Sequence, residues 1–374
     1  MTAPLSVTVL AGSAGIDASR SLEQLLQTSN ALRVAAIVPK RGKKRNRTSS
    51  SATIIPTTEN LVRLGKGCSC CTVRGDLMAK IQRLADEQNT DHIVIQAAAH
   101  DDLHTLAKTF TVANDSGAVL SNVARIEHLV TVIDATQFFA TFETDRVRAM
   151  LERIELANTI LLEGTAGQAS ERIERVLVAI RALNAGAQIV LADENDVGLA
   201  AFESNAPFDL DMAPVRAAGS ADPTLHPEED SAVVKFSYSA RRPFHPGRLH
   251  ALLQEPWPGV LRAQGTFWVA TRPDYVCELD IAGASRSTSS EGMWWATVPS
   301  SERPNNPALT QYLESIWDEQ FGDRHQALRI IGIESDESEL RTRLDSCLLT
   351  AEELADAAQW PLMDDPFQWP PTSV

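Results

Sequence analysis

The sequence has no long hydrophobic run, no leader-like start and few cysteines. No apolar stretch approaches the roughly 18 residues of a membrane span, so we expect no membrane association. The first residues, MTAPLSVTVLAGS, lack a basic region and lead into a strand-like run, which argues against a signal peptide. Five cysteines, three of them clustered, do not make a disulfide framework. These absences predict a cytoplasmic protein in a reducing compartment.

Positive charge is also scarce. The formal net charge is −15 at pH 7, which excludes a surface that binds nucleic acid over its whole extent, and we expect no DNA partner. Hydrophobic residues make up 44% and charged residues 22%, as in an ordinary globular protein. A chain of 374 residues is long enough for two domains, each with its own core.

Strand-like and helical patterns alternate through the first half of the chain. Apolar runs at 7–10, 34–38, 91–99, 127–135, 157–164 and 187–193 are typical of strands in a parallel sheet. Helical patterns lie between some of them, at 19–27 and 170–183. This alternation predicts an α/β domain with a doubly wound, mostly parallel sheet over residues 1–205.

The second half has a different organisation. Residues 206–231 are rich in Pro, Ala, Asp and Ser without periodicity and read as a linker. Strand patterns at 233–240, 265–271 and 292–298 and helical patterns at 246–253 and 337–344 predict a smaller α+β domain over 232–357, with an antiparallel sheet. The Pro-rich tail, 358–374, is expected to lie over the surface or to be disordered.

Several motifs resemble one family. The stretch GKGCSCCTVRGDL, residues 65–77, is close to the signature G-C-x-C-C-T-V-R-G-D-L of CobW-like P-loop proteins, which are GTP-dependent metal chaperones. ARRPFHPGRL, EPWPGVLRAQGTFWVATRP and FGDRHQALRIIGI are similar to that family's C-terminal domain. The resemblance covers about residues 5–360. It implies a P-loop NTPase-like GTPase domain, a CobW C-terminal domain, and zinc or cobalt handling by the cysteines.

The phosphate-binding loop departs from the pattern G-x-x-x-x-G-K-[ST]. Gly12, Gly15 and Ser19 remain, but Asp17 and Ala18 stand where the last glycine and the lysine are expected. A negative charge therefore replaces a positive one beside the triphosphate, and a unit pair about 4 Å apart interacts by ~4 kcal/mol at an effective dielectric of ~20. We interpret residues 12–19 as a vestigial P-loop.

Three other nucleotide motifs of the family are also replaced. The guanine-reading N-K-x-D is Glu-Gly-Thr-Ala at 163–166, and the carboxylate and glycine expected after the strand HIVI are Gln96 and Ala99. The segment PKRG stands where the family has Asn-Glu-Phe-Gly. We therefore predict a pseudo-GTPase that neither hydrolyses nor physiologically binds GTP, and no enzymatic activity.

The clustered cysteines are the predicted metal site. Thiolates are ligands that zinc prefers, and Cys68, Cys70 and Cys71 supply three of the usual four. The alternative is a group of reduced cysteines that persists by descent, and His100 with His104 is a second candidate metal pair. Cys277 and Cys347 read as core residues. His245 reads as a structural residue.

One segment is strongly basic. Residues 40–47 hold six cations without an apolar or aromatic side chain, which favours contact with a phosphate backbone over base stacking. We predict ribosomal RNA as the partner; a solvated loop and a nuclear-import signal are the alternatives. The residues are Lys40, Arg41, Lys43, Lys44, Arg45 and Arg47.

These features together resemble the actinobacterial CobW-like paralogues of zinc-limitation operons, which associate with the ribosome and recruit its hibernation factor. The first hypothesis is a non-enzymatic, zinc-responsive adaptor that binds the ribosome and recruits or assists a hibernation factor. Two alternatives stay open. One is a GTP-dependent zinc metallochaperone, and the other is a scaffold that delivers metal to a client protein without GTP.

Overall fold

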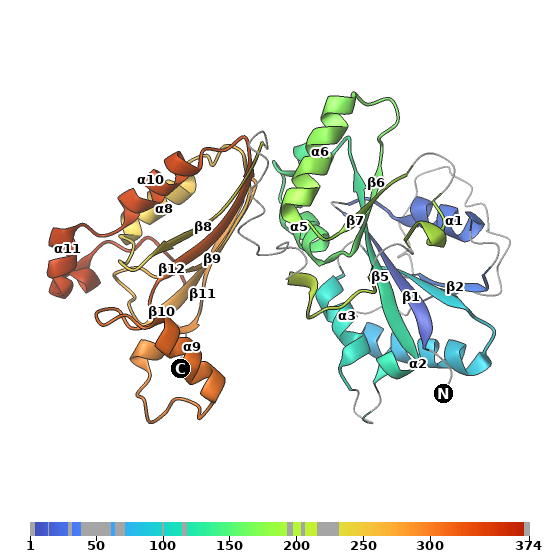
Figure 1. Cartoon of the computed structure of the whole chain (residues 1–374), viewed down its shortest axis with the longest axis horizontal. Helices are drawn as coiled ribbons and strands as arrows, with labels where there is room; N and C mark the ends of the chain where they lie inside the picture. Colours follow the sequence, from blue (N-terminus) through green and yellow to red (C-terminus); the bar gives the residue numbers. More distant parts are fainter. Residues whose placement is uncertain are drawn as a thin grey trace. The chain divides into compact units, whose positions relative to one another are not determined.

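The chain divides into two compact units (Figure 1). The computed structural model describes residues 4–13, 15–28, 32–38, 61–63, 72–98, 101–113, 117, 119–192, 197–202, 206–214 and 232–369. Residues 1–141 and 146–222 form the first unit, and residues 142–145 and 223–374 form the second. No helix in these ranges is long and apolar enough to cross a membrane.

The first unit is built on a parallel sheet of seven described strands in the order β3-β2-β4-β1-β5-β6-β7. Every pair of neighbouring strands runs parallel, which confirms the predicted doubly wound α/β class. The central strands are apolar on both faces, as burial between two layers of helices requires. The strands are β1 (Leu5–Gly12), β2 (Val34–Val38), β3 (Leu61–Arg63), β4 (His92–Gln96), β5 (Ala124–Asp134), β6 (Thr159–Glu163) and β7 (Gln188–Leu191).

Helices cover both faces of this sheet. α1 (Ser19–Thr28) packs with residues 197–202 on one face, where Leu22, Leu25 and Phe202 share a core cluster. The helices of the other face contact one another in chain order. They are α2 (Thr72–Glu87), α3 (Leu103–Thr111), α5 (Val147–Leu156) and α6 (Ser170–Leu183), with the short α4 (Phe138–Thr141) between β5 and α5. Short 3₁₀ turns are η2 (Leu120–Asn122) and η3 (Leu199–Phe202).

The segment after η3 belongs to the first unit. Phe208 is 6% exposed, and its amide N donates to the carbonyl O of Glu127 at 2.8 Å. Asn158 donates from Nδ2 to the carbonyl O of Ala206, and Ala213 is buried. Residues 206–214 are therefore packed chain, although their composition predicted the start of a linker. The apolar Phe208 is the feature that this prediction neglected.

The second unit is built on an antiparallel sheet of five described strands in the order β11-β10-β9-β12-β8. One face packs against α8 and α10 through a core that includes Phe236, Phe267 and Leu344. This confirms the predicted α+β class. The elements are β8 (Val233–Ala240), α8 (Pro246–Gln254), β9 (Val260–Phe267), β10 (Tyr275–Ala282), β11 (Ser285–Met293), η4 (Trp295–Thr297), α9 (Pro307–Ile316), β12 (Gln326–Ile333), α10 (Glu337–Cys347), α11 (Ala351–Ala355) and η5 (Ala357–Leu362).

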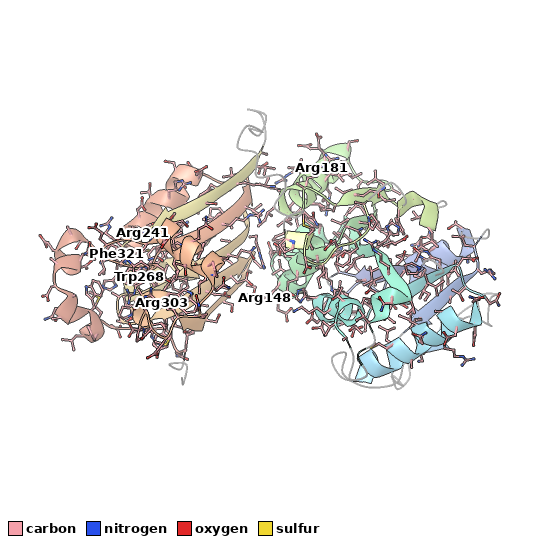
Figure 2. All side chains as sticks on the ribbon, turned by 60° about the horizontal axis from the view of Figure 1, so that its bottom comes forward. Arg148, Arg181, Arg241, Trp268, Arg303 and Phe321 are labelled. Carbon is pink, nitrogen blue, oxygen red and sulfur yellow. The ribbon has the colours of Figure 1, made fainter. Side chains whose placement is uncertain are left out.

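The predictions of strands at 265–271 and 292–298 were wrong in part, because the tryptophans of these segments lie beyond the ends of the observed strands. β9 ends at Phe267, and the next residue, Trp268, donates its backbone N–H to Gln326 Oε1 and its indole N–H to the Arg241 carbonyl. β11 ends at Met293, and Trp295–Thr297 is a 3₁₀ turn. Trp268 packs with Phe321 (Figure 2) and belongs with Trp294 to a separate cluster. Tertiary packing here overrides the β propensity of a tryptophan-rich run.

The end of the described tail joins this domain's core through Phe367 and Trp369. Phe367 is 6% exposed and packs against Phe267 and His250. Arg272 donates to the Asp365 carboxylate and to the carbonyls of Phe367 and Trp369. Part of the tail lies on the surface, as expected, since Leu362 is 75% exposed, but Phe367 is buried. Residues 357–362 form the 3₁₀ helix η5, which includes Pro361.

Candidate functional site

The candidate site of the first unit lies at the carboxyl ends of its central strands. β1 is the strand at which the order of the sheet reverses, since β4 lies on one side of it and β5 on the other. Ligands of open α/β sheets bind in the crevice at such a point. The loop between β1 and α1 begins this crevice, and the ends of β4, β5 and β6 face the same edge.

The loop after β1 keeps the geometry that its glycines allow. A Cβ at Gly12 would lie 2.1 Å from the carbonyl O of Ile16, so only glycine fits there. Gly15 has a positive φ of 89°. The Ile16 amide donates to the Ser13 carbonyl at 2.8 Å, which closes a tight turn before α1. The loop therefore remains folded where a P-loop is expected.

Asp17 turns its carboxylate toward the start of α1. Its Oδ1 accepts a hydrogen bond from the Ser19 amide at 3.1 Å and from the Ser19 hydroxyl at 2.5 Å. Gln96, at the end of β4, donates from Nε2 to the same oxygen at 3.2 Å and to Ser19 Oγ at 3.0 Å. Ala18 is 2% exposed and belongs to the core. The structure thus joins Asp17, Ser19 and Gln96, of which the sequence had linked only the first two.

Two further carboxylates lie at the same edge of the sheet. Glu163, the last residue of β6, accepts a hydrogen bond from the Ser21 hydroxyl at 2.6 Å. Asp134, the last residue of β5, accepts from the Thr136 amide at 2.8 Å and from its hydroxyl at 2.7 Å. The position expected to read a guanine base therefore holds a carboxylate that is bonded to α1.

Arginine is the other charged residue type at this edge. Arg153 of α5 is 5% exposed and donates to the carbonyls of Gly12, Ala98 and Asp101, which belong to the loops after β1 and β4. Arg146 lies beside the loop, since a Cβ on Gly15 would be 2.8 Å from its Nη1. Neither arginine was predicted from the sequence to belong to the site. An arginine on a helical pattern normally reads as a solvated side chain.

The predicted metal ligands and RNA-binding residues cannot be compared with the structure. Cys68, Cys70 and Cys71 lie outside the described residues, and so do His100 and the basic residues 40–47. The described ranges contain no group of three or more His, Cys, Asp or Glu residues that could hold a metal ion. α2 begins at Thr72, the residue after Cys71 in the sequence.

The remaining candidate residues, Cys277, Cys347 and His245, have structural roles in the second unit. Burial raises the pKa of the Cys277 thiol to about 12 and that of Cys347 to about 11, so neither offers a thiolate at neutral pH. His245 Nδ1 accepts hydrogen bonds from the amides of Gly247 and Arg248 and caps α8. These observations agree with the core and structural interpretations of the sequence.

Together, the parallel sheet, the glycine-containing loop before α1 and the separate antiparallel domain define a P-loop NTPase-like protein with an α+β extension. Two family profiles match this arrangement. Residues 6–191 match the CobW/HypB/UreG nucleotide-binding domain, and residues 233–348 match the cobalamin synthesis protein cobW C-terminal domain. The chain belongs to the CobW family.

Named relatives are similar to this chain at modest identity. The zinc-regulated GTPase metalloprotein activator 1 of Dictyostelium discoideum is 28% identical, with 97% of this chain and 84% of the relative covered. A zinc chaperone of Mycobacterium tuberculosis is 29% identical, with 83% and 80% covered. Among solved structures, the Zn(II)-bound YjiA GTPase from E. coli matches 93% of this chain and 100% of that chain at 16% identity, with a TM-score of 0.40.

Proposed function

We propose that this chain is a zinc-binding member of the CobW family that works without GTP turnover. The observation that carries the proposal is the Asp17 carboxylate, which accepts hydrogen bonds from the Ser19 amide, the Ser19 hydroxyl and the Gln96 amide. In a P-loop the backbone amides hold phosphate oxygens and the serine hydroxyl binds Mg²⁺. In this chain the Asp17 side chain of the loop itself accepts hydrogen bonds from the Ser19 amide and hydroxyl.

The charges at the edge of the sheet support the same conclusion. Asp17 lies in the loop itself, Asp134 and Glu163 end two strands at the same edge of the sheet, and Ala18 supplies no cation. Two arginines lie at this edge: Arg153 donates to the Gly12 carbonyl, and Arg146 lies beside Gly15. Three carboxylates outnumber the two guanidiniums, so the net charge of these groups is negative and opposes a polyanion.

The names of the relatives and the cysteine motif both support zinc as the bound metal. The described part of the chain has no competing cluster of metal ligands, and its two cysteines are buried with raised thiol pKa values. The motif Cys68, Cys70 and Cys71 directly precedes α2, and a helix N-terminus favours thiolates. Bound zinc would supply a four-coordinate centre in which these thiolates are three of the ligands.

The nucleotide part is tested by thermal unfolding with and without GTP and Mg²⁺. Unfolding is followed by circular dichroism, because all seven tryptophans lie in the second unit and their fluorescence would not report the first. We expect no GTP-dependent rise in Tm, whereas a ligand at about 1,000 times its Kd adds ~4 kcal/mol of stability. A rise that Ser19→Ala or Arg146→Gln abolishes would instead support the GTP-dependent zinc metallochaperone.

The zinc part is tested by metal content after dialysis. We expect about one zinc per chain, as in tetrahedral thiolate sites, and its loss in Cys70→Ser with Cys71→Ser. Cys277→Ser is the matched control, because that thiol is buried in the second unit. Zinc retained in the double variant would move the site elsewhere, and His104→Ala would then be the next variant.

We propose ribosomal RNA as a second partner, on the composition of residues 40–47 alone. Six cations in a chain of net charge −15 favour a polyanion, and their contacts would be to phosphates. On this proposal the protein is a zinc-responsive adaptor at the ribosome that recruits or assists a hibernation factor. The third candidate, metal delivery to a client without GTP, makes no use of these cations.

Co-sedimentation with ribosomes separates these candidates. Binding should weaken steeply with added salt and should be lost when Lys43, Lys44, Arg45 and Arg47 become alanine. The fold should be nearly unaffected, since surface changes of this kind usually alter stability by within about ±0.5 kcal/mol. Unchanged sedimentation of the quadruple variant would remove this segment as an anchor and favour the client-delivery scaffold.

A further inference from the structure

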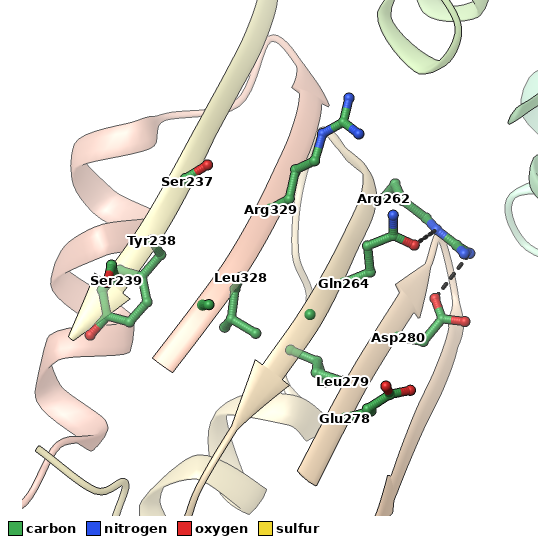
Figure 3. A pocket seen from close by; sticks show the side chains of 12 residues that line it. Ser237, Tyr238, Ser239, Arg262, Gln264, Glu278, Leu279, Asp280, Leu328 and Arg329 are labelled. Atoms are coloured by element: carbon green, nitrogen blue, oxygen red, sulfur yellow. Dashed lines mark hydrogen bonds and ion pairs between the residues drawn. The ribbon is translucent and has the colours of Figure 1, made fainter. Parts of the chain in front are cut away.

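The face of the antiparallel sheet opposite its core in the second unit carries charged side chains over a hollow of about 650 Å³ (Figure 3). Side chains alternate along each strand, so Tyr238, Leu279 and Leu328 belong to the core face. Tyr238 is also fixed there by a hydrogen bond to Asp345 of α10. The opposite face presents Ser237, Arg262, Gln264, Asp280 and Arg329 over strands β8, β12, β9 and β10.

Two cations lie close together on this face. Arg329 on β12 is directly opposite Ser237 on β8, and Lys235 is the next residue of β8 on the same face. Burial and the charge of Arg329 both lower the pKa of Lys235. Within the part of the chain that the structure describes, neither side chain has an ion pair with a carboxylate. Like charges held side by side repel each other, and an anion bound between them removes that repulsion.

The third cation of the face is already neutralised. Arg262 Nη1 lies 2.9 Å from Asp280 Oδ1, and Arg262 Nε donates to Gln264 Oε1 at 3.0 Å. Arg262 is 5% exposed, so this group forms a fixed floor of the hollow. Because Asp280 forms its ion pair with Arg262, it does not neutralise the charges of Arg329 and Lys235.

We propose that this hollow binds an acidic peptide segment, whose carboxylates pair with Arg329 and Lys235. Four strands about 4.8 Å apart span roughly 15 Å, which is the length of four or five extended residues at about 3.3 Å each and much larger than one small anion. A polynucleotide fits less well, because Glu278 on the same face would repel a backbone that is charged at every unit, whereas a peptide can place an uncharged residue there. No aromatic ring among the lining side chains faces the hollow for a base to stack on.

The experiment is a fluorescence-polarisation titration of the full chain with a short fluorescein-labelled peptide of alternating glutamate and glycine. We expect saturable binding at low salt, and at least a ~10-fold weaker affinity for Arg329→Gln with Lys235→Gln, since charge-assisted bonds are lost. Arg329→Lys with Lys235→Arg keeps both charges and should keep most of the affinity. Arg20→Gln with Lys108→Gln removes two exposed cations of the first unit and should leave binding unchanged.

Three results would overturn the proposal. They are absence of binding by the wild type, equal binding by the Arg329→Gln, Lys235→Gln variant, and tighter binding of a thymidine oligonucleotide that depends on the same two residues. Tryptophan fluorescence during urea unfolding checks that each variant keeps the fold of the second unit, where all the tryptophans lie. None of these outcomes depends on GTP, zinc or the ribosome.

Discussion

Two histidines lie on either side of β1 in the parallel sheet. His92 on β4 is directly opposite Ser6 of β1, and His128 on β5 is opposite Thr8. His92 shares a hydrogen bond of 2.9 Å with the Thr8 hydroxyl and is 7% exposed. Burial, together with the nearby His128, lowers the pKa of His92 to about 4, against an opposing effect of Glu127. The imidazole is therefore neutral in the folded protein at physiological pH.

This histidine makes stability dependent on pH. Unfolded His92 takes up a proton near its ordinary pKa of 6.5, while folded His92 does so only near 4. Its contribution is thus complete above pH 6.5 and is lost as the pH falls toward 4, by at most about 3 kcal/mol. We expect urea unfolding to show this loss in the wild type and a smaller one in His92→Gln.

His104→Gln is the matched control for this measurement. His104 is exposed on α3, so its substitution should leave the pH profile of the unfolding free energy unchanged. If His92→Gln and the wild type lose stability in parallel between pH 7 and pH 4, His92 is not the group that titrates.

Single residues also mark where sequence reasoning succeeds and where it ends. The charge of Asp17 could be read from the loop pattern, because a P-loop has a fixed spacing. Its bond to Gln96 could not, because the two residues are 79 positions apart and meet only when β4 pairs with β1. Arg153 gave no signal, since a sequence does not reveal which carbonyls a fold leaves without a backbone donor.

At the level of elements, Arg153 connects two loops of the candidate site. Its guanidinium reaches the carbonyls of Gly12, Ala98 and Asp101, and burial lowers its pKa without removing its charge at neutral pH. The loop after β4 is also closed by a hydrogen bond from the Ala98 amide to the Asp101 carboxylate at 2.7 Å. One side chain of α5 thus holds the loops after β1 and β4 in a fixed relation, without a nucleotide.

Arg153→Met should destabilise the first unit by about 3 kcal/mol, because it leaves buried carbonyls without donors. Hydrogen exchange should become faster in both loops, around residues 12–19 and 97–103. This measurement distinguishes the loss of the Arg153 hydrogen bonds to the two loops from a general packing defect. Arg181→Met on α6 replaces an exposed arginine and should change neither quantity. Unchanged hydrogen exchange in one of the two loops would show that Arg153 does not hold both loops.

Elements with a strong pattern were predictable, and elements set by distant contacts were not. β2 and α6 lie where apolar spacing placed them, at Val34–Val38 and Ser170–Leu183. The segment 292–298 is rich in β-forming residues, yet Asp323 accepts hydrogen bonds from the amides of Trp295 and Ala296 and fixes a 3₁₀ turn there. A carboxylate nearly thirty residues away thus decided the local structure.

For the whole molecule, the distribution of tryptophan separates the two units experimentally. All seven tryptophans lie between residues 257 and 369, so fluorescence follows only the second unit, whereas circular dichroism follows both. Each unit has its own core, one between the parallel sheet and its helices and one between the antiparallel sheet, α8 and α10. We therefore expect each unit to respond to substitutions in its own core.

Phe367→Ala tests this expectation at the tail. The side chain is 6% exposed among Phe267, Trp369 and His250, and removing it should lower the stability of the second unit by about 3 kcal/mol. The fluorescence-detected urea midpoint should fall, while Arg153→Met should lower only the dichroism transition of the first unit. Gln368→Ala, next to Phe367 but exposed, is the control and should alter neither signal. If Phe367→Ala and Arg153→Met each displaced both signals equally, the two units would unfold as one, and the antiparallel domain would not be an independent carrier of the acidic-peptide site.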